Sequence, residues 1–307
     1  MTPASKQYLP PEVLARIGRL DLRARAVVEG VLTGMHKSPY KGNSVEFLQH
    51  REYTRGDDLR RVDWKVWGRQ DRFYVKEYEN ETNLRLFLLV DGSASMDYIP
   101  PRFDQTLGLT KYDYAATLAT SLAWLGLSQG DAVGASIFDE RVRTSVPART
   151  NRSHLSSLIA GLEKPRQKHH SDFHSVLRNL AENLPRRGLV IIFSDLFGER
   201  DAIYKGLQVL RQRGHDVAIC HVLDDDELDF PFDGPTRFEG LELGGEISCN
   251  PRALRDGYLQ AMEQFLGEVR HRSAASQCDY QLVRTSQAVD KTLVNFLSRR
   301  SKTRGRS

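Results

Sequence analysis

Two short apolar runs constrain the fold of this chain more than any other feature of its 307 residues. Residues 84–90 (LRLFLLV) and 189–194 (LVIIFS) are almost entirely apolar, and an aspartate follows each run directly. Strands that are apolar along their whole length are typical of parallel sheets, because helices cover such sheets on both faces. The two runs therefore predict buried core strands of an α/β fold.

The segments around these runs continue the pattern as an alternation of strands and helices. Further strands are expected at residues 132–138, 142–146, 217–222 and 280–284, and helices at 111–128, 173–184, 201–213, 252–276 and 288–297. Connections long enough to hold a helix are typical of parallel strands. We therefore predict a doubly wound, mostly parallel sheet in one Rossmann-like domain over residues 84–298.

The first 83 residues are predicted to form an N-terminal helical and charged extension. Apolar residues recur at spacings of three and four along residues 12–33, which predicts one amphipathic helix. We expect it to dock on the body of the chain, with a coiled coil as the alternative. Residues 43–83 interleave charges with aromatic rings, and residues 72–79 alternate like a strand. Because acids among these bases would repel phosphate, we interpret Arg60, Asp63 and Trp64 as structural rather than as an RNA surface.

Composition excludes several classes of protein. The chain has 40% hydrophobic and 27% charged residues, as globular proteins do, and no apolar run approaches the roughly 18–20 residues of a membrane helix. Its three cysteines contain no C-x-x-C pair, and its N-terminus has no signal-peptide core. We therefore expect a cytoplasmic protein without a membrane partner.

The net charge of +4 comes from the end of the chain. The last ten residues contain five basic side chains and no acid, which leaves 39 basic against 40 acidic residues, or −1, for the rest. A near-neutral body gives no reason to expect a nucleic-acid groove. We predict that residues 299–307 form a basic, disordered tail, with nucleic-acid binding through that tail as an alternative function.

The two aspartates after the apolar runs mark the candidate site. In an open α/β sheet, ligands bind beyond the carboxyl ends of the strands. Asp91 opens the sequence D-G-S-A-S, so in an extended segment its side chain and those of Ser93 and Ser95 would point the same way. Together with Asp195 they form a set of oxygen ligands, which suits Mg²⁺ or Mn²⁺ rather than zinc.

The D-x-S-x-S segment resembles the metal-ion-dependent adhesion site of von Willebrand factor A domains. That site also uses a threonine before a helix and an aspartate after the next core strand, and Ser171 and Asp195 match these positions. The resemblance implies a Mg²⁺ or Mn²⁺ cofactor held by Asp91, Ser93, Ser95, Ser171 and Asp195.

The upstream segment REY-x-x-GDD-x-R-x-x-DW, from Arg51 to Trp64, is similar to that of a prokaryotic family catalogued only as a domain of unknown function. Its members are typically encoded beside MoxR-type AAA+ ATPases. The ending LVNFLSRR is similar too, so the resemblance spans about residues 15–300. It implies an adaptor or assembly factor that binds proteins through a divalent metal, with a MoxR-type ATPase and an unknown client as partners.

An enzyme that uses the same metal for hydrolysis is the other alternative. It would need a general base near Asp91, and only His170 and His174 are in reach by sequence. The motifs G-x-x-x-x-G-K-[ST], G-x-S-x-G and H-E-x-x-H are all missing from the sequence, so we predict no catalytic residue. The acidic run at residues 224–227 lacks the spacing of a calcium loop, and we interpret it as a solvated loop.

Overall fold

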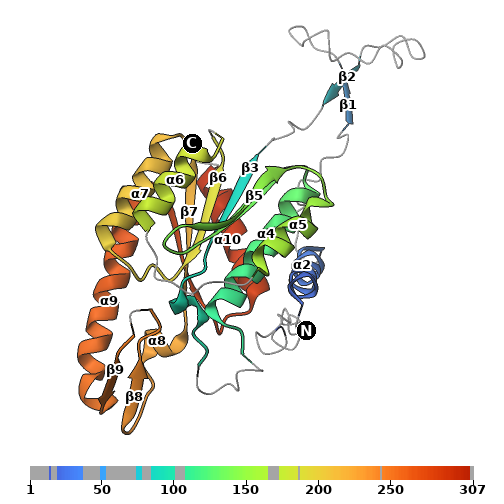
Figure 1. Cartoon of the computed structure of the whole chain (residues 1–307). Helices are drawn as coiled ribbons and strands as arrows, with labels where there is room; N and C mark the ends of the chain where they lie inside the picture. The colour runs from blue at the N-terminus through green and yellow to red at the C-terminus, as the bar shows by residue number, and fades with distance from the viewer. Residues whose placement is uncertain are drawn as a thin grey trace.

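The computed structural model describes residues 14, 19–36, 49–52, 74–77, 84–100, 108–164, 173–185, 187–242 and 244–304. Its centre is a six-stranded sheet with the strand order β10-β7-β6-β3-β4-β5 (Figure 1). The strands are β3 (Arg85–Asp91), β4 (Ala132–Phe138), β5 (Val142–Arg149), β6 (Leu189–Ser194), β7 (Asp216–Leu223) and β10 (Asp279–Arg284). All neighbours are parallel except β4 and β5, which are antiparallel. This topology confirms the predicted α/β fold class with a mostly parallel sheet.

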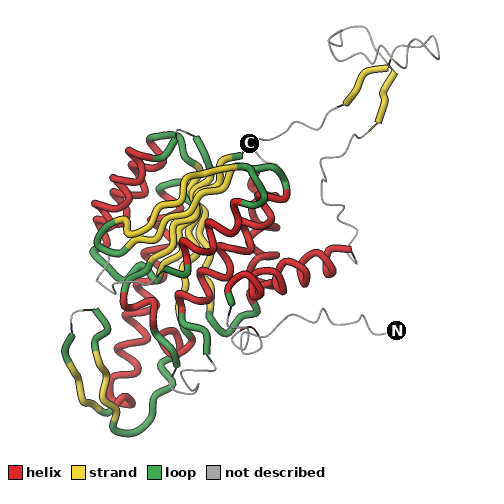
Figure 2. Tube along the Cα trace, turned by 45° about the vertical axis from the view of Figure 1, so that its right-hand side comes forward, coloured by secondary structure: helices red, strands yellow, loops and turns green. Residues whose placement is uncertain are grey.

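Helices cover both faces of the sheet (Figures 1 and 2). One face carries α4 (Lys111–Ser128), α5 (His154–Leu162) and α10 (Val289–Arg304), and the other carries α6 (Phe173–Asn183), α7 (Arg200–Gln212) and α9 (Pro251–Ala275). Successive residues of β3 divide between the two layers: Leu88 joins the core cluster of α4, whereas Phe87 and Leu89 join that of α6 and α7. This division explains why the strand is apolar throughout.

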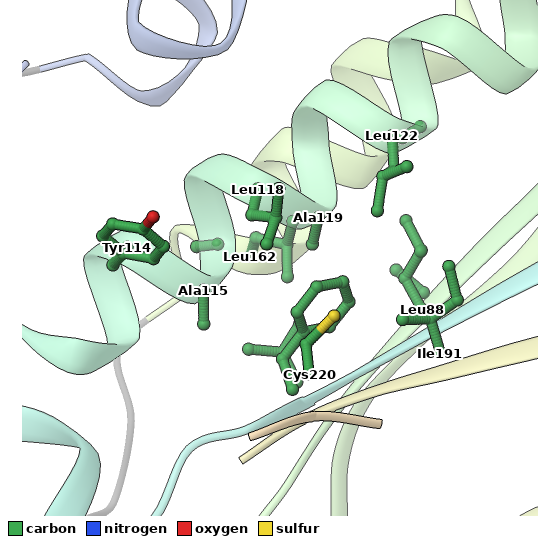
Figure 3. Packing of buried hydrophobic residues seen from close by; sticks show 14 of the residues in the cluster. Leu88, Tyr114, Ala115, Leu118, Ala119, Leu122, Leu162, Ile191 and Cys220 are labelled. Carbon is green, nitrogen blue, oxygen red and sulfur yellow. The ribbon is translucent and has the colours of Figure 1, made fainter. Parts of the chain in front are cut away.

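The packing of α4 on the sheet shows how the first layer is built (Figure 3). Leu122 of α4 lies over Leu88 of β3 and Ile191 of β6. A capping box begins the helix: the Thr110 hydroxyl accepts the Asp113 N–H at 2.9 Å, and the Asp113 carboxylate accepts the Thr110 N–H at 3.3 Å. Lys111 therefore becomes the first residue of α4.

The N-terminal helix α2 (Leu20–His36) packs on this same layer. Its residues Leu20, Val27 and Val31 are buried and belong to the core cluster of α4. Figure 1 shows α2 beside α4 and α10. The expected docking of the helix on the body is confirmed, so residues 20–36 share the core of the α/β domain.

Other parts of the predicted extension are only partly described. The strands β1 (Gln49–Glu52) and β2 (Tyr74–Glu77) form an antiparallel pair, and β2 falls within the strand expected at residues 72–79. Arg60, Asp63 and Trp64 lie outside the described residues.

Two expectations about the C-terminal half are wrong. The helix α10 continues through Arg304, and Arg300 donates to Asp279 at 2.6 Å and also contacts Asp216, so the tail is not disordered from residue 299. The acidic run is not a solvated loop either, because it begins the short helix α8 (Asp225–Asp229). Asp224 and Asp226 are buried there. The hairpin of β8 (Thr236–Glu239) and β9 (Glu246–Cys249) follows α8.

Candidate functional site

The two predicted aspartates come together at one edge of the sheet. Asp91 is the last residue of β3, and Asp195 directly follows β6, the parallel neighbour of β3. Both side chains are fully buried. The carboxyl ends of two central strands therefore supply the carboxylates, as the sequence predicts.

Hydrogen bonds from neighbouring residues hold the Asp91 carboxylate in place. Its Oδ1 accepts the Ser93 N–H at 2.9 Å, and its Oδ2 accepts the Ser194 hydroxyl at 2.6 Å. Burial, with the negative charge of Asp195 nearby, raises the pKa of Asp91 from 3.8 to about 6, although the hydrogen bonds of Ser194 and Ser93 oppose this rise. Buried negative charge at this edge would be relieved by a cation.

Ser93 and Ser95 lie beside Asp91, although the segment does not stay extended. Ser93 has extended backbone angles, and the 3₁₀ helix η2 (Ala94–Asp97) begins directly after it. The two hydroxyl oxygens nevertheless lie 3.1 Å apart. Two adjacent ligands of an octahedral Mg²⁺, each bound at 2.0–2.1 Å, are separated by about 3 Å, so this serine pair fits a divalent cation.

Both carboxylate oxygens of Asp195 also accept hydrogen bonds from the protein. Its Oδ1 accepts the Phe197 N–H at 3.2 Å, and its Oδ2 accepts the ammonium of Lys111 at 2.7 Å. The backbone carbonyl of Asp195 lies 2.8 Å from Nε2 of the buried His221, whose pKa burial lowers to about 4. The neutral imidazole therefore donates to that carbonyl and fixes the start of the loop.

Lys111 and Glu227 are site residues that the sequence analysis missed. The Lys111 side chain is fully buried, and its ammonium lies 2.5 Å from Glu227 Oε1 and 5.0 Å from the centre of the Phe197 ring. Burial lowers the pKa of Lys111, but Asp195 and Glu227 outweigh it, so the net shift is upward and the ammonium stays charged. A cation in the first turn opposes the helix dipole, and this placement was the only signal in the sequence.

The remaining candidates are not assembled by the described residues. Ser171 and His170 lie outside them. His174 lies half-buried in the first turn of α6, and within the described part of the chain no hydrogen bond joins it to Asp91 or Asp195. No cluster of three or more His, Cys, Asp or Glu suited to a metal occurs among those residues.

The six-stranded, mostly parallel sheet with helices on both faces defines an α/β protein. Residues 49–265 match the family described as "Protein of unknown function DUF58", and the chain belongs to that family. It is 29% identical to Uncharacterized protein Rv1480 of Mycobacterium tuberculosis over 94% of this chain and 90% of the relative. Neither description indicates an enzymatic activity.

Solved structures are similar to about 70% of the chain at low sequence identity. The conserved hypothetical protein BatB from Bacteroides thetaiotaomicron is 15% identical, with a TM-score of 0.45 over 71% of this chain and 99% of that one. The SpRpn10 VWA domain is 14% identical, with a TM-score of 0.36 over 69% of this chain and 94% of that one.

The expectation of a cytoplasmic location is corrected by these comparisons. An aerotolerance-related membrane protein from Bacteroides fragilis is among the similar structures, at 18% identity and a TM-score of 0.43, over 69% of this chain and 97% of that one. In the described residues, no helix combines the length and apolar character needed to cross a bilayer. The lack of such a helix does not place the chain in the cytoplasm.

Proposed function

We propose that this chain is a protein-binding module whose docking centre is a divalent cation at the carboxyl edge of the sheet. The observation that supports this proposal most directly is the pair of serine hydroxyls 3.1 Å apart beside the buried carboxylate of Asp91. Mg²⁺ or Mn²⁺, when bound, supplies an open coordination position to an oxygen ligand from outside. Neutral hydroxyls suit this role because, unlike further carboxylates, they add no negative charge around the cation.

The ligands in this proposal are Asp91, Ser93, Ser95, Ser171 and Asp195. Asp91 accepts the Ser93 N–H at Oδ1 and the Ser194 hydroxyl at Oδ2, which fixes the direction of the carboxylate that would bind the cation. The ligand set has two carboxylates at most, and a third carboxylate from a partner protein would complete the coordination. An aspartate or glutamate of the partner is therefore the expected outside ligand.

We further propose that the partner is a MoxR-type AAA+ ATPase, with this chain as an adaptor or assembly factor for a client protein. This part rests on the resemblance of the segment from Arg51 to Trp64. The von Willebrand factor A-like fold supports the coarser statement that the chain is an interaction module.

A capture experiment tests the proposal. Immobilised wild-type chain, Asp91→Ala and the control Asp201→Ala are each mixed with a MoxR-type ATPase in Mg²⁺ or in EDTA. Asp201 is a suitable control because its side chain is 64% exposed on α7, far in sequence from the D-x-S-x-S segment. We expect capture by wild type and Asp201→Ala in Mg²⁺, and its loss with EDTA or Asp91→Ala. Equal capture by all samples would overturn the proposal.

A further inference from the structure

The buried Lys111 forms an ion pair with Asp195, one of the carboxylates that the proposed function assigns to the divalent cation. The ammonium of Lys111 lies 2.7 Å from Asp195 Oδ2 and 2.5 Å from Glu227 Oε1, and its side chain has 0% exposure. Burying an ammonium costs several kcal/mol unless it is paired and hydrogen-bonded. A cation in the first turn of a helix is further disfavoured by the helix dipole. The two carboxylates are therefore what keep Lys111 in this position.

We propose that Lys111 is an internal cation of the site, which holds Asp195 when no metal is bound and competes with a divalent cation for that carboxylate. An ammonium and a metal ion both need the lone pairs of Asp195. Asp195 Oδ2 accepts the Lys111 ammonium, so a metal ion that binds this oxygen has the ammonium as its competitor. Lys111 thereby sets how tightly the site binds a cation. This inference rests on the proposed function, because it assumes that a cation binds beside Asp91.

Glu227 gives the Lys111 ammonium a second anionic partner, so that Asp195 can exchange between the ammonium and a metal ion. Its Oε2 accepts the Asp224 N–H at 2.8 Å in the capping box of α8, so the carboxylate is fixed whether or not Asp195 faces the lysine. When Asp195 turns to a metal, the ammonium still has a buried anionic partner. Lys111 is therefore a positioning residue with two carboxylate partners, and it need not leave the site.

The charge balance of the site agrees with this role. Asp91, Asp195 and Glu227 carry three negative charges when ionised, and Lys111 carries one positive charge. The net charge of these four groups is then −2, which the +2 charge of one Mg²⁺ or Mn²⁺ would balance. Removal of the ammonium should strengthen cation binding, and removal of the charge of Glu227 should weaken it, because the ammonium would then pair with Asp195 alone.

The test measures binding of Mn²⁺ alone to the full chain by calorimetry at pH 7.5. Lys111→Met keeps most of the length of the side chain and removes its charge, whereas Glu227→Gln keeps an acceptor for the Asp224 N–H. Lys205→Met is the control, because Lys205 is an exposed lysine of α7. We expect an affinity about tenfold or more higher for Lys111→Met, several-fold lower for Glu227→Gln and unchanged for Lys205→Met.

A second readout follows the melting temperature in EDTA and in Mn²⁺. Lys111→Met leaves Asp195 and Glu227 without their cation, so we expect it to melt below wild type in EDTA and to gain more from Mn²⁺ than wild type does. If Lys111→Met does not fold, the Mn²⁺ affinity of Glu227→Gln relative to wild type still tests the role of Lys111. Equal Mn²⁺ affinity in wild type, Lys111→Met and Glu227→Gln would overturn the role of Lys111. Capture of the ATPase by Asp91→Ala would instead overturn the proposed function.

Discussion

At the scale of single residues, the site combines groups that are costly to bury. Asp91, Asp195 and Lys111 are each fully buried, and only Lys111 and Asp195 pair directly. Asp91 accepts the Ser93 backbone N–H and the hydroxyl of Ser194. Proteins retain such destabilising groups where function requires them, so Asp91 should reduce stability while serving the site.

We predict that Asp91→Asn is more stable than wild type at pH 8 in EDTA. The pKa of Asp91 rises from 3.8 to about 6 on folding, so the folded state holds a proton more tightly than the unfolded state. The ionised carboxylate therefore destabilises the fold above about pH 6, by up to about 3 kcal/mol at 1.4 kcal/mol per pKa unit. The penalty shrinks as the pH falls through 6 and is absent below 3.8.

Urea unfolding of both proteins between pH 5 and pH 8 measures this difference. Asn is nearly isosteric with Asp: its carbonyl can accept the Ser93 N–H, and its amide can donate to the Ser194 hydroxyl. Mg²⁺ should reverse the order by stabilising wild type alone. A variant no more stable than wild type at pH 8 would show that the carboxylate is already compensated within the protein.

At the scale of elements, the helices of the second layer meet through a glycine. A Cβ built on Gly206 of α7 would lie 2.7 Å from Cδ1 and 2.8 Å from Cβ of Leu177 on α6. Leu177 is fully buried, so it has little freedom to move away. The close approach of α6 and α7 thus depends on the absence of a side chain at Gly206.

Gly206→Ala should lower the melting temperature, whereas Gly257→Ala on α9 should raise it. Overpacking typically costs about 1–3 kcal/mol, which outweighs the gain of up to about 1 kcal/mol from replacing a helical glycine with alanine. Nothing lies within 4 Å of a Cβ on Gly257, so the helix propensity alone acts there. Calorimetric melts of the two variants beside wild type give the comparison. Stabilisation by both substitutions would show that α6 and α7 can separate without cost.

The sequence predicted elements best where a local pattern determines them. The helix at residues 111–128 and the strands at 132–138 and 189–194 have the predicted bounds, because apolar periodicity and a capping residue mark them. The helix α8 was not predicted, although Asp224 and Glu227 form a local capping box; its acids are also held by distant partners, since Tyr98 donates to Asp226 and Thr285 contacts Asp224. The ordered end of α10 likewise depends on Asp216 and Asp279, which no local pattern links to Arg300.

The contrast between local patterns and distant contacts also separates the site residues that the sequence predicts, Asp91 and Asp195, from Lys111 and Glu227, which it does not. Asp91 and Asp195 each follow an apolar strand, and the topology of a parallel sheet brings such positions together. Lys111 lies 84 positions from Asp195 and 116 from Glu227, so its pairing follows from tertiary structure alone. Ser171 stays a prediction, because it lies outside the described residues.

At the scale of the whole molecule, the N-terminal helix is part of the same folding unit as the sheet. Val27 and Val31 of α2 belong to one core cluster with α4 and strands β3 and β4. Arg23 of α2, which is only 8% exposed, also pairs at 3.4 Å with Asp113, the capping residue of α4. Lys111 is the first residue of α4, so α2 supports the helix that carries the buried ammonium of Lys111.

We therefore predict that Val27→Asp destabilises the entire chain rather than releasing one helix. An unpaired carboxylate at this fully buried position should cost about 3–5 kcal/mol, and the same change at Leu32, which is 46% exposed, should cost within about 0.5 kcal/mol. Because α2, α4 and the sheet share a core, circular dichroism and tryptophan fluorescence should report one coincident transition at a lower temperature. The weakened support of α4 should also loosen Lys111 and lower its hold on Asp195. An unchanged main transition preceded by a separate early one would instead show that α2 is an independent appendage, and the site would then owe nothing to the N-terminal segment.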